Sequence, residues 1–144
     1  MIEIRPYREA DELEVISLWR EVFPQSPPWN DPRLDIQRKL AVQRDLFIVA
    51  LDGPRIVGTA MAGYDGHRGW VYYVGVDPRF RRQGVGTTLM RRVEHDLERL
   101  GCPKLNLQVR TSNSQTAEFY RRLGYAVEDR LSMSKLLARP QGGS

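Results

Sequence analysis

The residue types best suited to chemistry lie in a loop rich in arginine and glycine, which joins an apolar segment to one with helical periodicity. A strand that enters a helix through such a loop turns several unpaired amides, and the positive end of the helix dipole, toward one point. Glycine lets the backbone approach phosphate oxygens closely. The pattern therefore predicts an anion site, most naturally for a pyrophosphate. The loop residues that carry this prediction are Arg79, Arg81, Arg82, Gly84 and Gly86.

Two familiar nucleotide motifs do not fit this loop. The nucleoside-triphosphate loop requires Gly-x4-Gly-Lys-Ser/Thr, which the sequence lacks. The dinucleotide fingerprint Gly-x-Gly-x-x-Gly fails at its third glycine, where Leu89 stands. Taken alone, Gly-x-Gly is equally compatible with an ordinary turn before a helix.

Composition narrows the class of protein. The 144 residues are 41% hydrophobic and 28% charged, as expected of one globular domain. The net charge of +4 favours anionic partners without separating nucleic acid from phosphorylated small molecules. One cysteine and two histidines do not supply a ligand set for structural zinc, so we expect no metal. With no leader-like start and no long apolar run, the expectation is a soluble, cytoplasmic protein without a membrane segment.

The elements that must position the loop follow from periodicity and breaker residues. The expected order is β-α-α-β-β-β-α-β-α-β-β, a mixed α/β sheet in one domain over residues 1–137, with a disordered tail at 138–144. The helix that starts at Gly84 links two strands as a parallel crossover. Expected helices cover 10–22, 32–44, 84–100 and 114–123, and expected strands cover 2–5, 46–51, 56–64, 70–76 and 105–109, with two short strands within 125–137.

Two motifs resemble a known family. The run from Arg81 to Gly86 resembles the Gln/Arg-x-x-Gly-x-Gly/Ala signature of the GNAT superfamily of N-acetyltransferases. Downstream, Asn113 followed by Phe119-Tyr120 and then Gly124-Tyr125 is similar to that family's Asn-x2-Ala-x2-Phe-Tyr-x3-Gly-Phe element, with Thr116 in place of the alanine. In element order the resemblance covers about residues 2 to 137, and it implies the central sheet of the acyl-CoA N-acyltransferase type.

The resemblance implies that acetyl-coenzyme A (acetyl-CoA) is the donor of an acetyl group to a primary amine of a small molecule or peptide. The main chain of Val74 and Val76 would then pair with the pantetheine arm as an added strand would, and Asn113 would touch the same arm. Tyr120 would face the sulfur and give a proton to the departing thiolate. The pyrophosphate would lie on the loop residues Arg81, Arg82, Gln83, Gly84, Val85, Gly86 and Thr87.

The general base and the acceptor site are less defined. Asp65 and His67, in the glycine-rich loop before strand 70–76, are the nearest titratable candidates for a base, although Asp65 could simply cap the turn and water could carry the proton. In the resembled family the first two helices and their link shape the acceptor site. Trp29, Asn30 and Asp31 are therefore acceptor candidates, with helix capping as their plainer interpretation.

Two alternatives remain open. One is a nucleic-acid module that uses the aromatic strand around Trp70, Tyr72 and Tyr73, although its motif and element order fit poorly. The other is an acyl-CoA-binding protein without catalysis. We expect no nucleic-acid partner, and a homodimer is plausible because many members of the resembled family pair through their last strands.

Overall fold

The computed structural model describes residues 1–24, 26–27 and 30–137. Their contacts divide the chain into two units, Met1–Leu107 and Gln108–Ser144. The first unit contains the whole sheet, and the described part of the second contains one helix.

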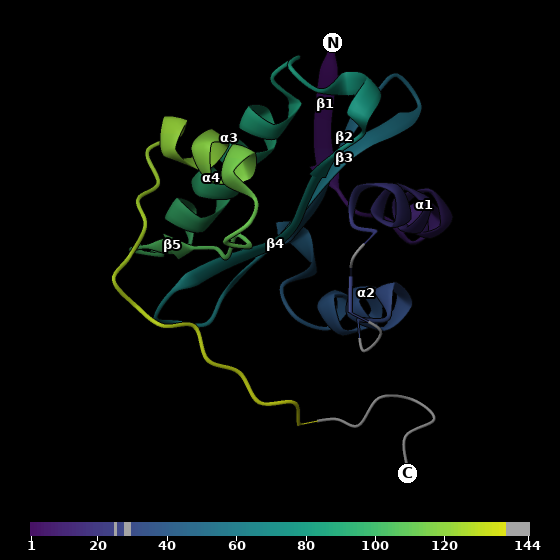
Figure 1. Ribbon diagram of the computed structural model, residues 1–144. Coiled ribbons are helices and arrows are strands. Elements are labelled where there is room, and N and C mark those ends of the chain that lie inside the picture. The colour runs from purple at the N-terminus through teal and green to yellow at the C-terminus, as the bar shows by residue number, and fades with distance from the viewer. Residues whose placement is uncertain (25, 28–29, 138–144) are drawn as a thin grey trace. The chain divides into compact units, whose positions relative to one another are not determined.

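The sheet has five strands in the order β1-β2-β3-β4-β5 (Figure 1). The first four pair antiparallel, and β4 pairs parallel with β5, as a crossover through the intervening helix requires. The strands are β1 Ile2–Pro6, β2 Phe47–Asp52, β3 Arg55–Tyr64, β4 Gly69–Val76 and β5 Leu105–Asn106. The helices are α1 Glu12–Val22, α2 Pro32–Leu40, α3 Val85–Arg99 and, in the second unit, α4 Ser114–Arg122.

Helices cover both faces of the sheet, with α1 and α2 on one side and α3 on the other (Figure 1). On the first side Trp19 of α1 packs with Phe47 of β2, and both are fully buried. On the second side α3 buries Leu89 and Val93. Because both faces are covered, β2 is apolar at nearly every position and does not alternate.

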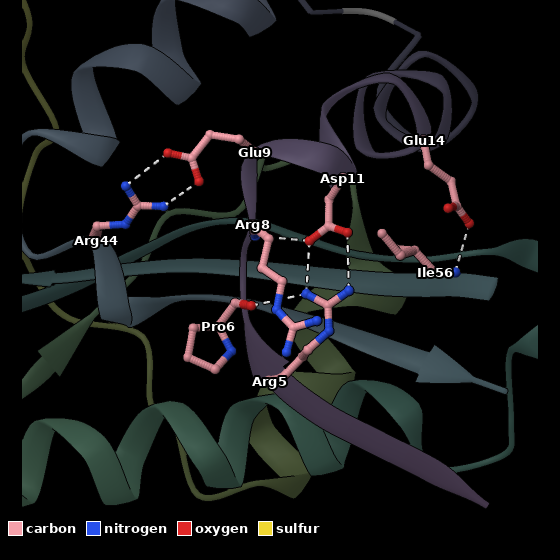
Figure 2. A network of polar contacts seen from close by, with 8 residues as sticks. All are labelled: Arg5, Pro6, Arg8, Glu9, Asp11, Glu14, Arg44 and Ile56. Carbon is pink, nitrogen blue, oxygen red and sulfur yellow. Dashed lines mark hydrogen bonds and ion pairs between the residues drawn. The ribbon is translucent and has the colours of Figure 1, made fainter. Parts of the chain in front are cut away.

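A network of charged side chains fixes the start of the chain to the first helix (Figure 2). Arg5 of β1 donates to both carboxylate oxygens of Asp11, at 2.8 and 3.0 Å, and the amide of Arg8 donates to the same carboxylate at 2.8 Å. Glu14 of α1 accepts the amide of Ile56 on β3 at 2.7 Å. These contacts fix α1 against β1 and β3.

The helices and strands expected from the sequence are confirmed from β1 to α4, although several of them begin or end at other residues. The second helix ends at Leu40 and not near Arg44, because Gln43 takes a left-handed backbone (φ 51°) and its side chain bonds the main chain of Tyr64. The strand expected over 105–109 is only two residues long.

The two strands expected within 125–137 are absent from the described residues, which have no regular structure there. The side chains of Leu131 and Met133 are 91% and 89% exposed. A strand requires a hydrogen-bonded neighbour, and within the second unit no other strand is described. Alternation of side chains alone therefore does not create a strand here.

Candidate functional site

The outer edge of β4 is open over most of its length. β4 pairs with β5 only at Gly69 and Trp70, so among the described strands none pairs with that edge from Val71 to Val76. An open edge offers amide donors and carbonyl acceptors to an extended ligand with amide groups. Val74 and Val76 lie within this open stretch.

A β-bulge interrupts the pairing of β4 with β3 at the same place. Thr59 lies opposite Gly75 and Met61 opposite Tyr72, so two residues of β4 face one residue of β3. Tyr73 takes a left-handed backbone (φ 53°), and its ring stacks on Trp19 with 3.8 Å between centroids. The buried hydroxyl of Thr59 accepts from Trp19 Nε1 at 2.9 Å and donates to the Tyr73 carbonyl at 2.7 Å. The bulge is therefore fixed by side chains of α1 and β3.

Asp77 anchors the turn that follows β4. Its amide donates to the Val57 carbonyl at 2.8 Å, and its buried carboxylate accepts from the amide and guanidinium of Arg79 and from Arg55. The hydrogen bonds from Arg79 hold the pKa of Asp77 below its usual range. Arg79 is thus paired with Asp77, a carboxylate that it shares with Arg55, so less of its charge is available to the anion site than the sequence suggests.

The loop after Asp77 presents backbone to solvent where α3 begins. Arg81, Arg82, Gln83 and Gly84 are exposed, and Arg82 (φ 64°) and Gly84 (φ 79°) are both left-handed. Gly84 is the N-cap of α3 and supplies no side chain to the first amides of this 15-residue helix. These uncapped amides and the helix dipole give the loop the local geometry of an anion site.

The last residues of this loop differ in whether their side chains or only their backbone amides are accessible to a ligand. The side chain of Val85 is buried, and it lies 3.2 Å from where a Cβ on Gly58 would stand. Gly86 and Thr87 are half-buried in the first turn of α3. Val85 can therefore offer only its amide to a ligand.

In the second unit, Asn113 and Tyr120 belong to α4. Asn113 is its N-cap, and its side-chain oxygen accepts the amide of Thr116 at 3.2 Å. Its side-chain NH2 group is left to donate elsewhere. Tyr120 is buried and makes edge-to-face contacts with Phe119 and Tyr125. Burial raises the pKa of Tyr120 to about 12, and within residues 108–137 its hydroxyl makes no hydrogen bond.

The two candidate bases lie in the exposed loop between β3 and β4. The Asp65 carboxylate accepts the amides of His67 and Arg68, each at 2.8 Å. These hydrogen bonds lower the pKa of Asp65. Asp65 thus caps the turn, and the His67 side chain is exposed.

The acceptor candidates lie at the start of α2. Asp31 is the N-cap of α2 and accepts the amide of Arg33 at 3.0 Å, as its position before Pro32 predicted. The Asn30 amide donates to the Pro27 carbonyl at 2.9 Å, and its side chain is exposed. Trp29 lies outside the described residues.

No sequence pattern indicates the polar pair that joins α2 to β4. The Tyr73 hydroxyl donates to Asp35 Oδ2 at 2.5 Å. Burial and this hydrogen bond raise the pKa of Tyr73. The pair depends on the bulge, which turns Tyr73 toward the helices, and no local pattern encodes that turn. Because Tyr73 packs in the core, only Tyr72 of the aromatic run is largely exposed, which weakens the nucleic-acid interpretation.

Neither a metal-binding cluster nor a membrane-spanning helix is present in the described residues. No cluster of three or more His, Cys, Asp or Glu side chains there could hold a metal ion. In the same residues, no helix combines the length and the apolar character needed to cross a bilayer.

Comparisons with known proteins agree with this architecture. A family model described as "Acetyltransferase (GNAT) family" matches residues 13–125. The structure of AAC(6')-Iy in complex with the bisubstrate analog CoA-S-monomethyl-acetylneamine is similar, with a TM-score of 0.78, 18% identity, and coverage of 96% of this chain and 99% of that one.

Two further solved structures have the same fold. Ard1 from Thermoplasma volcanium has a TM-score of 0.73 and 23% identity, covering 88% of this chain and 84% of that one. The ribosomal-protein-S18-alanine N-acetyltransferase from Escherichia coli has a TM-score of 0.72 and 21% identity, and the match covers 86% of this chain and 77% of that one. The fold class expected from the sequence is confirmed.

Proposed function

Because the chain belongs to the GNAT acetyltransferase family, we propose that it moves the acetyl group of acetyl-CoA to a primary amine by direct attack in a ternary complex. The observation that carries this proposal is the continuity of one backbone surface. The open edge of β4 runs through the Asp77 turn into the uncapped start of α3. An extended, amide-bearing arm that ends in a pyrophosphate matches both parts of that surface.

In this proposal the backbone holds the donor. The main chain of Val74 and Val76 pairs with the pantetheine arm, and the amides from Arg82 to Thr87 receive the pyrophosphate. Arg81 and Gln83 add exposed polar side chains beside it. Asn113 donates its side-chain NH2 to the arm, since its oxygen is occupied in capping α4.

The reaction then needs three contributions. The neutral amine attacks the thioester carbonyl, so that an N–C bond forms and the C–S bond breaks. The amide near Val76 stabilises the oxyanion that develops between these events. Tyr120 gives its proton to the thiolate and recovers one from the acetylated nitrogen through solvent, so the products are an amide and free coenzyme A. A phenol that stays protonated, as burial makes Tyr120, suits this role.

The incoming ammonium must first lose a proton. Asp65 is a poor base because its carboxylate is engaged by two amides. His67 or water therefore takes the proton. An unchanged pH–rate profile in His67→Ala would leave water as the base.

The acceptor is an amine of a small molecule or peptide, and the reaction requires neither nucleic acid nor a membrane. The free Cys102 is compatible with the reducing cytoplasm. The direct experiment measures free thiol released from acetyl-CoA across a panel of amines and peptides, with calorimetry of acetyl-CoA binding alongside. Binding without turnover on any acceptor would favour an acyl-CoA-binding protein, and no binding would reject both functions.

A further inference from the structure

The side of α2 that faces the sheet carries two opposite charges that do not meet. Asp35 and Lys39 are one helical turn apart, a spacing at which an acid and a base ordinarily attract each other. Asp35 instead accepts the Tyr73 hydroxyl, and its other oxygen lies 3.9 Å from Arg38 Nη1. Among the described residues no ion pair joins Asp35 to Lys39.

Lys39 is a half-buried cation that no acid neutralises in the described part of the chain. Its Nζ lies 3.5 Å from the point where a Cβ on Gly63 would stand, close over β3. Burial lowers the pKa of Lys39, and no carboxylate opposes that effect. Partial burial without a counter-charge costs free energy, which an anionic group bound at this ammonium would offset.

An aromatic surface lies between the two charges. Residues opposite each other in an antiparallel pair share a face of the sheet. Tyr72 lies opposite Met61, which packs in the core beneath α1 and α2, and Trp70 lies opposite Gly63, next to Lys39. Tyr72 is 54% exposed. Along β4, the Asp35 carboxylate therefore lies at Tyr73, the exposed ring is that of Tyr72, and the Lys39 ammonium lies near Trp70.

The phosphates of the donor do not account for Lys39. The loop proposed to hold them, residues 81–87, follows the C-terminal end of β4. Lys39 lies near the N-terminal end of the same strand, beside Gly63 and its partner Trp70. Asp35, in contrast, meets β4 at Tyr73, next to Val74 of the open edge.

We propose that the acceptor is an amine that also carries a carboxylate, with its ammonium drawn to Asp35 and its carboxylate bound by Lys39. This inference rests on the proposed function and names the class of its second substrate. Tyr73 holds the Asp35 carboxylate beside the bulge, where the amine must reach the thioester. Tyr72 covers the carbon chain between the two charged groups.

The test uses linear ω-amino acids of increasing length and their primary amides as acceptors at saturating acetyl-CoA. We expect kcat/KM to be about tenfold or more higher for the best acid than for its amide, since one charged hydrogen bond distinguishes them. Lys39→Met should remove this preference, and Lys39→Arg should retain it. Lys104→Met, which removes an exposed lysine before β5, is the matched control and should leave it unchanged.

Asp35→Asn should raise KM for the acid and the amide alike, because it removes the attraction for the ammonium that both share. If the unmodified enzyme acetylates acids and amides equally well, the inference is overturned and the proposed function stands. A preference for acids that survives in Lys39→Met also overturns it. If no amine of any kind is acetylated, both the inference and the proposed function fail.

Discussion

Burial decides which chemistry Tyr120 can perform. It raises the pKa of the phenol to about 12, far above the value of about 8.5 for a simple thiol. Tyr120 therefore keeps its proton near neutral pH, when a thiolate leaving group needs one. A residue with these properties is suited to donate a proton and unsuited to act as the base.

Replacing Tyr120 by Phe keeps the ring and removes the proton. We expect kcat to fall about 100-fold while the Kd for acetyl-CoA changes little, because the lost interaction forms only as charge develops on sulfur. Thiol release gives kcat, and calorimetry gives the Kd. Tyr64→Phe, which in the same way removes the hydroxyl of a half-buried tyrosine outside the proposed site, is the control. An unchanged kcat would remove Tyr120 from the mechanism.

Residues that act through local backbone could be predicted from the sequence, and residues that meet across the fold could not. Gly84 and Asp31 could be predicted because a glycine at the start of a helix and an N-cap before proline have local signatures. Asp35 and Lys39 look like ordinary polar residues of a helix. Their positions over β4 and β3 depend on packing between elements. The position of Asp35 also depends on the bulge at Tyr73, which no sequence pattern predicts.

For the helices and strands, sequence patterns predicted each element that lies within the first 107 residues. The strand pattern failed where no neighbouring strand is described to pair with it. Residues 125–137 alternate apolar and polar side chains in part, yet form no strand among the described residues. Helices need only their own backbone for hydrogen bonds, whereas a strand needs a neighbour, so the α4 pattern was sufficient and the strand pattern was not.

The junction of β4 and α3 can be tested with two matched glycines. Gly84 (φ 79°) and Gly53 (φ 60°) are both left-handed, and a Cβ on either meets nothing within 4 Å. Alanine at either position should cost about 1 kcal/mol of unfolding free energy, from backbone strain alone. Only Gly84→Ala should also weaken acetyl-CoA binding, since only its Cβ would stand at the proposed pyrophosphate. Urea unfolding and calorimetry measure the two effects, and equal donor binding by both variants would contradict the assignment.

The link between β1 and α1 should make stability depend on acid. Burial raises the pKa of Asp11, but hydrogen bonds from Arg5 and the Arg8 amide outweigh it, so the net shift is downward. The folded state therefore holds this proton less tightly than the unfolded chain. The contribution is fully present above about pH 4, the unfolded value, and is lost as pH falls through the lower folded pKa.

Asp11→Asn should accordingly lower the unfolding free energy by about 1–3 kcal/mol at pH 7, where Arg5 loses its ionised partner. The difference from the unmodified protein should shrink below about pH 4. Denaturant unfolding at a series of pH values measures both. Asp45→Asn, at an exposed carboxylate, serves as the control. A difference that stays constant with pH would show that Asp11 acts by packing and not through its charge.

The residues that the proposed function assigns to the donor come from both units of the molecule. The backbone of β4 and α3 comes from Met1–Leu107, and Asn113 and Tyr120 come from Gln108–Ser144. We propose that residues 1–137 act as one domain once the donor is bound. A ligand that contacts both units in the folded state and neither in the unfolded state must stabilise them together.

This coupling can be measured because the units carry different probes. All three tryptophans lie in the first unit, so their fluorescence follows its thermal unfolding, and amide hydrogen exchange of α4 follows the second. At one hundred times the Kd, acetyl-CoA should add about 2.7 kcal/mol of stability, roughly 5 °C or more in Tm, and should slow exchange in α4 in parallel. Both effects should be smaller in Gly84→Ala at the same donor concentration. If tryptophan unfolding shifts while α4 exchange does not, the donor binds to the first unit alone, and Asn113 and Tyr120 have no part in holding it.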